Sequence, residues 1–216
     1  MDPDQRFSKY QWINARVRKA RDNRRESYTP DLDSIEIVSS VLGTGSDWAA
    51  RWEWVEPLIG PSMCELQRRL RDGGRDTEAT LGLVKPRSLR RLLIRPDSPE
   101  WSAADLERLR QYPLWGNSPP RELEKLPVRF TYEYECQDAN CSGHRHRCTD
   151  WEMAQTYRSW KRLYGNGWEE KFLDRYEREM REIKDIHFYV GTHSLYPTWI
   201  VIGLFYPPLT PQARLL

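Results

Sequence analysis

The amino-acid sequence predicts an α+β fold, with a mainly antiparallel sheet backed by helices and one zinc-stabilised loop. Residues 128–135 alternate between apolar and polar side chains, which is typical of a half-buried strand. Residues 186–190 and 199–205 read as two further strands, joined by a short connection that contains Pro197. Between these strands, aromatic side chains recur every four residues, which indicates helices that pack on the sheet.

The N-terminal part of the chain is expected to add two strands. Residues 12–18 alternate, so that Ile13, Ala15 and Val17 would face the core. Residues 35–38 form the second candidate strand, which the segment Gly43-Thr44-Gly45 ends.

The middle of the chain is expected to be mostly helical. Ser62 and Glu65 have the spacing of a capping box, and the helix they begin would end at Gly73-Gly74. Pro86 suits the first turn of another helix, which would carry three arginines on one face at four-residue steps. The other expected elements are a helix from Ser46, a strand over residues 81–84, and a short helix marked by Ser102 and Asp105.

Two helices are expected between the cysteine-rich loop and the C-terminal strands. Thr149 and Glu152 form a second capping-box pattern, opening a helix with Trp151 on its apolar side. The segment Gly165-Asn166-Gly167 separates it from a helix over residues 168–183. A single domain over residues 1–216 is expected, and the proline-containing loop 113–127 is its only candidate boundary.

One cluster of cysteine and histidine predicts a metal site. Cys136, Cys141, His144 and Cys148 have the spacing C-x4-C-x2-H-x3-C, with His146 as an alternate ligand. Zinc prefers four nitrogen or sulfur donors in a tetrahedron, and four protein ligands leave no open position for water. The expected cofactor is therefore structural zinc. Buried free cysteines are the competing interpretation, which the polarity of this loop disfavours. Cys64, far away in the sequence, is expected to be a core residue.

Composition and targeting signals indicate a cytoplasmic protein. No segment approaches the roughly 20 apolar residues that span a bilayer, and the polar N-terminus has no secretory signal. In that setting, clustered cysteines favour metal binding over disulfides. We therefore expect no membrane partner.

Arginines predict a binding surface for DNA or RNA. The candidate residues are Arg16 and Arg18 on one strand face, Arg87 and Arg91 on one helix face, and Arg145 and Arg147 in the zinc loop. Guanidinium groups suit bidentate contacts with phosphate. The competing interpretation is an ordinary arginine-rich surface, because the net charge is only +2.

Two other functions remain open at this stage. The chain could be a protein-interaction or regulatory module without catalytic activity, using exposed aromatic residues and the 113–127 loop. It could instead be an enzyme with a pocket near His193. The sequence has no Gly-rich phosphate loop, no G-x-S-x-G and no H-E-x-x-H, so the balance is against an enzyme.

Two segments carry a resemblance to other proteins. The cysteine/histidine stretch running into Asp150-Trp151-Glu152, and residues 188–193 with 202–208, resemble an uncharacterised family of bacterial zinc-cluster proteins. The resemblance covers roughly the last ninety residues and implies a bacterial source. It brings no activity and no functional residue with it.

Overall fold

The computed structural model of the 216-residue chain describes residues 6–111, 124–193 and 198–209. Most of the expected loop 113–127 lies outside these residues. The chain divides into two compact units. The first comprises Met1–Lys19, Tyr28–Leu42 and Ile94–Arg129, and the second comprises Ala20–Ser27, Gly43–Leu93 and Phe130–Leu216. The expectation of a single domain stays a prediction.

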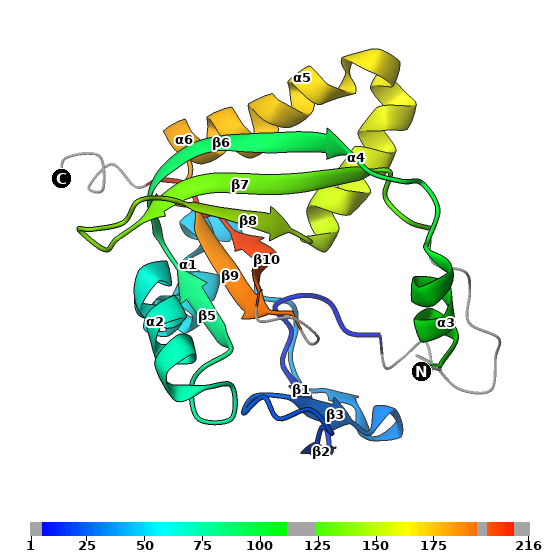
Figure 1. The fold of residues 1–216 in the computed structure, drawn as a ribbon, viewed down its shortest axis with the longest axis vertical. Coiled ribbons are helices and arrows are strands. Elements are labelled where there is room, and N and C mark those ends of the chain that lie inside the picture. Colours follow the sequence, from blue (N-terminus) through cyan, green and yellow to red (C-terminus); the bar gives the residue numbers. More distant parts are fainter. Residues whose placement is uncertain (1–5, 112–123, 194–197, 210–216) are drawn as a thin grey trace. The chain divides into compact units, whose positions relative to one another are not determined.

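The predicted α+β class is confirmed. In the described part of the chain, the main sheet has six strands in the order β5-β9-β10-β8-β7-β6 (Figure 1). The pairs β5/β9, β9/β10 and β7/β8 are antiparallel, and β10/β8 is parallel. The strands are β5 (Leu81–Val84), β6 (Pro86–Pro96), β7 (Val128–Cys136), β8 (His144–Cys148), β9 (His187–Thr192) and β10 (Trp199–Phe205).

The prediction of a helix that begins at Pro86 is wrong, because this segment forms the edge strand β6. Its buried positions, Pro86, Leu89 and Leu92, recur every three residues, which resembles helical spacing. Pairing with β7 overrides this local preference. An edge position also accommodates Pro86, which has no N–H to donate to a neighbouring strand.

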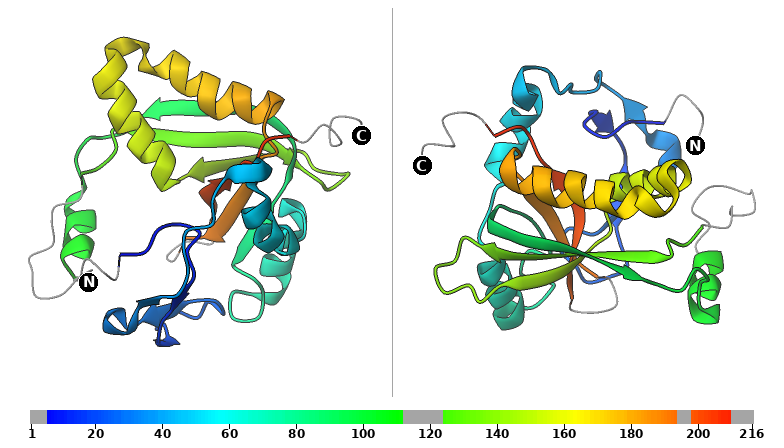
Figure 2. Two further views of the ribbon diagram at one scale, coloured as in Figure 1. Left: turned by 180° about the vertical axis from the view of Figure 1, so that it is seen from behind. Right: turned by 90° about the horizontal axis from the view of Figure 1, so that it is seen from above.

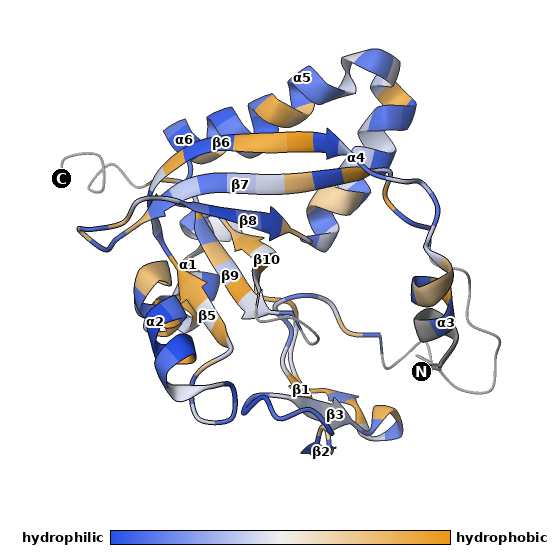
Figure 3. Cartoon of the chain, in the orientation of Figure 1, coloured by the Kyte–Doolittle hydropathy of each residue, from blue (hydrophilic) through white to orange (hydrophobic). Residues whose placement is uncertain are grey.

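The prediction of a loop over the cysteine/histidine segment is also partly wrong, because its second half, His144–Cys148, forms the strand β8. Tyr134 pairs with His144, and Phe130 pairs with Cys148. Along β8, His146 and Cys148 are buried while Arg145 and Arg147 are exposed, so the alternation of a strand was present in the sequence. Figure 3 shows hydrophilic residues along most of this strand.

A helical layer covers one face of β6, β7 and β8 (Figure 2). Phe130 of β7 stacks on Phe172, with ring centroids 4.8 Å apart. The Tyr132 hydroxyl donates to the Tyr176 carbonyl over 2.9 Å. The layer consists of α4 (Trp151–Tyr164), the 3₁₀ turn Gly165–Gly167, α5 (Trp168–Leu173), the π turn Asp174–Arg178 and α6 (Glu179–Glu182).

The N-cap of α4 is Asp150, one residue beyond the expected Thr149. The Asp150 carboxylate accepts from the backbone N–H of Met153 over 2.8 Å and of Leu204 over 3.1 Å. One buried side chain therefore caps the helix and joins it to β10. Trp151, expected on the apolar side, is 68% exposed.

Two helices precede β5. In α1 (Gly45–Val55) Ser46 is not the N-cap, because Ser46, Asp47 and Trp48 have positive φ and form a left-handed turn before the regular part of the helix. Trp52 of this helix stacks on Phe205 of β10. In α2 (Met63–Gly73) the predicted cap is confirmed, because Ser62 Oγ accepts from the N–H of Glu65 over 3.2 Å. A short 3₁₀ turn, Glu56–Leu58, lies between the two helices.

The first unit contains short elements. The strand expected over residues 12–18 is instead two strands with different partners. β1 (Ile13–Asn14) pairs with β4 (Glu36–Ile37), and β2 (Val17–Lys19) pairs with β3 (Tyr28–Pro30), both antiparallel. Val17, expected in the core, is 57% exposed. The unit also contains the 3₁₀ turn Leu32–Ser34 and the helix α3 (Ala103–Gln111). As predicted, Ser102 caps the start of α3, because its Oγ accepts from the N–H of Asp105.

Candidate metal centre

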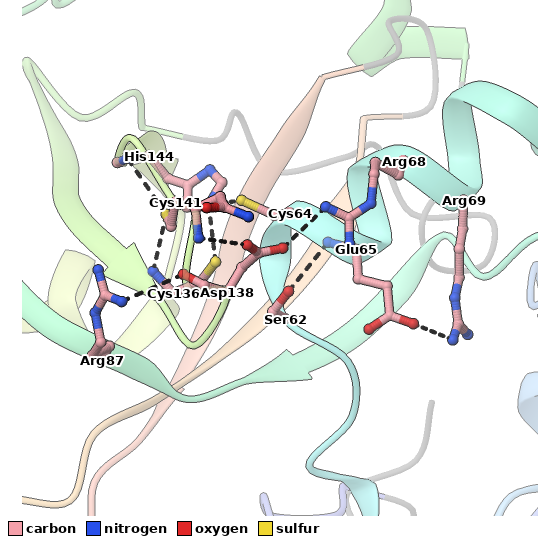
Figure 4. A network of polar contacts seen from close by, with 12 residues as sticks. Ser62, Cys64, Glu65, Arg68, Arg69, Arg87, Cys136, Asp138, Cys141 and His144 are labelled. Atoms are coloured by element: carbon pink, nitrogen blue, oxygen red, sulfur yellow. Dashed lines mark hydrogen bonds and ion pairs between the residues drawn. The ribbon is translucent and has the colours of Figure 1, made fainter.

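Three cysteines and one histidine meet where the N-terminus of α2 lies against the β7–β8 hairpin (Figure 4). Cys136 ends β7, Cys141 lies in the hairpin turn and His144 begins β8. The fourth member is Cys64, in the first turn of α2. Their ligand atoms all lie within 4.8 Å of one another. The cluster could therefore hold a metal ion.

Two distances between donor atoms in the cluster are close to those of a tetrahedral zinc site. Zinc lies about 2.3 Å from thiolate sulfur and about 2.0–2.1 Å from imidazole nitrogen, which puts neighbouring donors about 3.5–3.8 Å apart. His144 Nε2 lies 3.3 Å from Cys136 Sγ and 3.4 Å from Cys64 Sγ. Only a small adjustment would bring these donors to the separation that zinc requires.

Backbone N–H groups are already directed at the sulfur of Cys141. The amides of Cys136 and Gly143 both donate to Cys141 Sγ over 3.4 Å. Gly143 has φ +103, a left-handed conformation that favours glycine and turns this amide toward the sulfur. Hydrogen bonds of this kind stabilise a thiolate, the form that binds metal.

Protons are unevenly distributed over the metal-free thiols. Burial opposes ionisation of Cys136, but hydrogen bonds from the backbones of Cys64 and Asp138 and from His144 lower its pKa to about 6. Burial, together with the neighbouring Cys136 and Cys141, raises the pKa of Cys64 to about 12. Once one thiolate forms, a second is costly without a cation. A dication such as Zn²⁺ supplies the missing charge.

The group of potential ligands that the structure brings together contains Cys64 where the sequence predicted Cys148. His144 and Cys148 are four residues apart on one strand, which separates their Cα atoms by roughly 13 Å. Cys148 is instead buried beneath α4, where its sulfur lies 3.5 Å from Met153 Sδ. The sequence predicts Cys64 in the core, because no local spacing connects it to the hairpin. Its position in the first turn of a capped helix was the available signal.

His146, the alternate ligand, does not join the cluster. His146 is buried two residues further along β8 than His144, opposite Tyr132 of β7. Its Nδ1 lies 3.0 Å from the Tyr134 hydroxyl. Its ring stacks on that of His144, with centroids 5.6 Å apart. Burial and the nearby His144 lower the pKa of His146 to about 4, so it is neutral near neutral pH. His146 therefore packs against the ring of His144, one of the four potential ligands.

Charged residues line the opposite face of the same strands. Because side chains alternate along β7, Glu133 and Glu135 lie on the face away from Tyr132 and Tyr134. Arg91 and Arg145 both pair with Glu133, while Arg87 and Arg90 both pair with Glu135. We call this surface the arginine face; its residues are Arg87, Arg90, Arg91, Arg145 and Arg147, with Glu133 and Glu135.

The two glutamates are largely covered by the arginines around them. The side chains of Glu133 and Glu135 are 13% and 22% exposed, whereas that of Arg145 is 59% exposed. The bond from Arg87 lowers the pKa of Glu135 to about 2, and Arg91 likewise lowers that of Glu133. Both carboxylates are therefore ionised under ordinary conditions, and they hold the guanidinium groups in place.

The other sequence candidates lie elsewhere. Arg16 and Arg18 belong to the first unit, where they line an open cavity of about 630 Å³ together with Asp31 and Asp33. Arg16 pairs with Asp31 over 2.9 Å. His193 follows β9, and its carbonyl accepts from Arg75. Within the described ranges, the cysteine/histidine cluster is the one group of potential metal ligands, and His193 is not part of it.

Comparisons with known proteins bear on the family alone. The family described as domain of unknown function (DUF8757) matches residues 60–216, and a second, described as domain of unknown function (DUF8758), matches residues 1–57. This is consistent with the expected resemblance to an uncharacterised family; neither description mentions a zinc cluster or a bacterial source. No curated protein matches the chain. No solved structure matches it. Within the described segments, no helix is both long and apolar enough to cross a bilayer.

Proposed function

We propose a function from the geometry of the protein, because the chain belongs to the family described as domain of unknown function (DUF8757), and that description names no activity. The proposed function is that of a zinc-stabilised protein that binds nucleic acid through its arginine face. The zinc is structural, held by Cys64, Cys136, Cys141 and His144. Four protein donors leave no position for substrate or water. Zinc would tie α2 to the β7–β8 hairpin and so fix the end of the sheet that carries the arginine face.

The metal can be tested by elemental analysis of protein purified without chelator. We expect about one equivalent of zinc, since four donors of this type match one tetrahedral ion. Removing it should lower the midpoint of thermal unfolding, because metal affinity contributes directly to folding stability. Protein that contains no metal and does not take up added zinc would overturn this part of the proposal.

The observation that supports nucleic-acid binding is the excess of cations on one exposed sheet face. The arginine face has five guanidinium groups and two carboxylates. Since Glu133 and Glu135 already orient four of the arginines, a phosphate chain meets donors that lose little conformational freedom on binding. Planar guanidinium groups can share a carboxylate on one edge and contact phosphate with another. The face is therefore suited to a linear polyanion.

Salt dependence and charge reversal test the nucleic-acid proposal. Affinity for labelled oligothymidylate and oligouridylate should fall steeply as salt rises, because binding releases counterions. The double variant Arg91→Glu, Arg145→Glu should lose most of this affinity for every sequence alike. Arg178→Glu is the matched control, because Arg178 is also exposed and paired, with Asp174, but lies in the helical layer on the other face.

The outcome also decides between the proposed function and the protein-interaction alternative. Trp151, 68% exposed at the start of α4, favours that alternative because large exposed aromatics are common in protein interfaces. Wild-type protein that shows no salt-sensitive binding to DNA or RNA would overturn the nucleic-acid proposal. A stoichiometric protein partner lost on Trp151→Ala would then support the interaction module.

A further inference from the structure

The metal centre and the arginine face share the hairpin turn 137–143. Cys141 is one of the four metal donors, and its backbone N–H donates to the Asp138 carbonyl over 3.1 Å. The same carbonyl accepts from Arg87 Nη1 over 3.4 Å. The Asp138 carboxylate pairs with Arg68 of α2 over 3.0 Å (Figure 4).

A second contact lies at the other end of the turn. Gly143 packs against the guanidinium of Arg90, such that an added β carbon would lie 3.4 Å from Arg90 Nη1. The Gly143 amide also donates to Cys141 Sγ. Arg87 and Arg90 thus touch the turn that the metal would anchor. Arg91 and Arg145 are held by Glu133, away from the turn.

A bound metal would therefore affect Arg87 and Arg90, which touch the turn, more than Arg91 and Arg145, which Glu133 holds away from it. A bound ion fixes Cys141 relative to Cys64 and Cys136, which holds the turn in one conformation. Without the ion, the turn keeps its internal hydrogen bonds, the weak hydrogen bonds to the sulfur of Cys141 and the exposed contact with Arg68, but loses the link from Cys141 to Cys64 that the metal would make. A displaced turn would take away the contacts that Arg87 and Arg90 make with Asp138 and Gly143, and leave both arginines held by Glu135.

We propose that zinc occupancy of the Cys64/Cys136/Cys141/His144 cluster controls the affinity of the arginine face for nucleic acid through the turn 137–143. This inference rests on the proposed function. The two affinities must change together: if the zinc-loaded protein binds nucleic acid more tightly, then the protein with nucleic acid bound must hold zinc more tightly by the same factor. Coupling of ordinary strength corresponds to a change of about fivefold or more in either affinity.

The experiment measures transfer of zinc from the loaded protein to a chromogenic chelator, with and without oligothymidylate. In the wild type, saturating oligothymidylate should raise the affinity for zinc about fivefold or more, measured as the equilibrium partition of zinc between protein and chelator. The double variant Arg87→Ala, Arg90→Ala should still bind oligothymidylate, although with lower affinity. In this variant, bound oligothymidylate should no longer protect zinc from the chelator. Arg91→Ala is the matched control: it should weaken binding while saturating oligothymidylate still protects zinc.

Each result has a defined meaning. Binding of oligothymidylate with no effect on the affinity for zinc would overturn the coupling and leave the proposed function intact. Equal protection in the wild type and in the Arg87→Ala, Arg90→Ala variant would overturn the route through the turn. Absence of any salt-sensitive binding by the zinc-loaded wild type would overturn both the proposed function and this inference.

Discussion

Cys64 Sγ and His144 Nε2 lie 3.4 Å apart, although 80 positions separate the two residues in the sequence. The contact joins the first turn of α2 to the start of β8. A metal bridging these atoms would close a long loop of chain, and cross-links that close long loops restrict the unfolded state most. Folding and metal binding are then expected to be strongly linked.

Cys64→Ala and Cys148→Ala form a matched pair that tests which cysteine is the fourth ligand. Loss of an outer-shell partner already lowers metal affinity about 10- to 100-fold, so loss of Cys64 should lower zinc affinity by more. Cys148→Ala should keep one zinc and lose only about 1–2 kcal/mol of stability, from its packing on Met153. Competition with a chromogenic chelator and urea unfolding measure the two effects. The reverse pattern would restore Cys148 as the ligand.

Zinc binding is expected to release a proton from Cys64 near neutral pH. The pKa of Cys64 is raised to about 12, so its thiol is protonated in the metal-free protein and must ionise to bind zinc. Cys136, with a pKa of about 6, is already largely ionised and contributes little. Calorimetric titration in buffers of different ionisation enthalpy measures the released protons. Binding heats that are independent of the buffer would contradict this prediction.

The sequence predicted those elements that are fixed by local patterns. The alternation in residues 128–135 correctly located β7, and the Ser62–Glu65 pattern correctly located the start of α2. The failure at β6 has a physical reason, since the three-residue repeat of its buried side chains imitates a helix. Pairing with β7, a neighbour distant in the sequence, gives this segment its strand conformation.

The metal site shows the same division between local and long-range information. Cys136, Cys141 and His144 lie within one hairpin, and their spacing alone grouped them. Cys64 joins them only through the packing of α2 beside the sheet, where a β carbon on Gly82 would lie 2.8 Å from Leu66. Such a contact depends on tertiary structure, and the sequence contains no spacing that encodes it.

Acid should destabilise the protein partly through His146. The folded-state pKa of His146 is lowered from 6.5 to about 4, so between these values the unfolded chain binds a proton that the folded protein does not. Stability is therefore lost as pH falls through this window, by about 2 kcal/mol between roughly pH 7 and pH 5. His146→Gln should remove this part of the pH dependence, while the glutamine amide can still form a hydrogen bond with the Tyr134 hydroxyl.

Urea unfolding of wild type and His146→Gln at both pH values measures the effect of His146. Acid also releases zinc from both proteins, so only the difference between them reports on His146. Equal acid sensitivity of the two proteins would show that His146 is not the group responsible.

Glu133→Gln should strengthen nucleic-acid binding rather than weaken it. The substitution removes a negative charge between Arg91 and Arg145 but leaves an amide oxygen that can accept from them. A guanidinium released for phosphate contact should steepen the dependence of log affinity on log salt by about one. Stability should fall by no more than about 1 kcal/mol, because these ion pairs are partly exposed. Fluorescence anisotropy at several salt concentrations tests this, and weaker binding would contradict the charge argument.

Arg181→Ala should destabilise the sheet at its edge strand. Among the described strands, β6 has β7 as its one neighbour, and side chains from the π turn and α6 contact its backbone. Arg181 donates to the carbonyls of Leu89 and Arg90, while Glu177 accepts from the N–H of Leu92. An uncovered edge also invites pairing with other molecules. We expect a loss of about 2 kcal/mol and more aggregation on heating, because two charge-assisted hydrogen bonds to the edge strand disappear together with the Arg181–Glu177 ion pair.

Arg178→Ala is the control for this prediction, since Arg178 forms only a partly exposed ion pair with Asp174 one turn earlier. Its loss should cost less than about 1 kcal/mol, because exposed helical pairs contribute little. Urea unfolding and light scattering during heating compare the two variants. If Arg181→Ala and Arg178→Ala behave alike, Arg181 stabilises the helix and not the edge of the sheet.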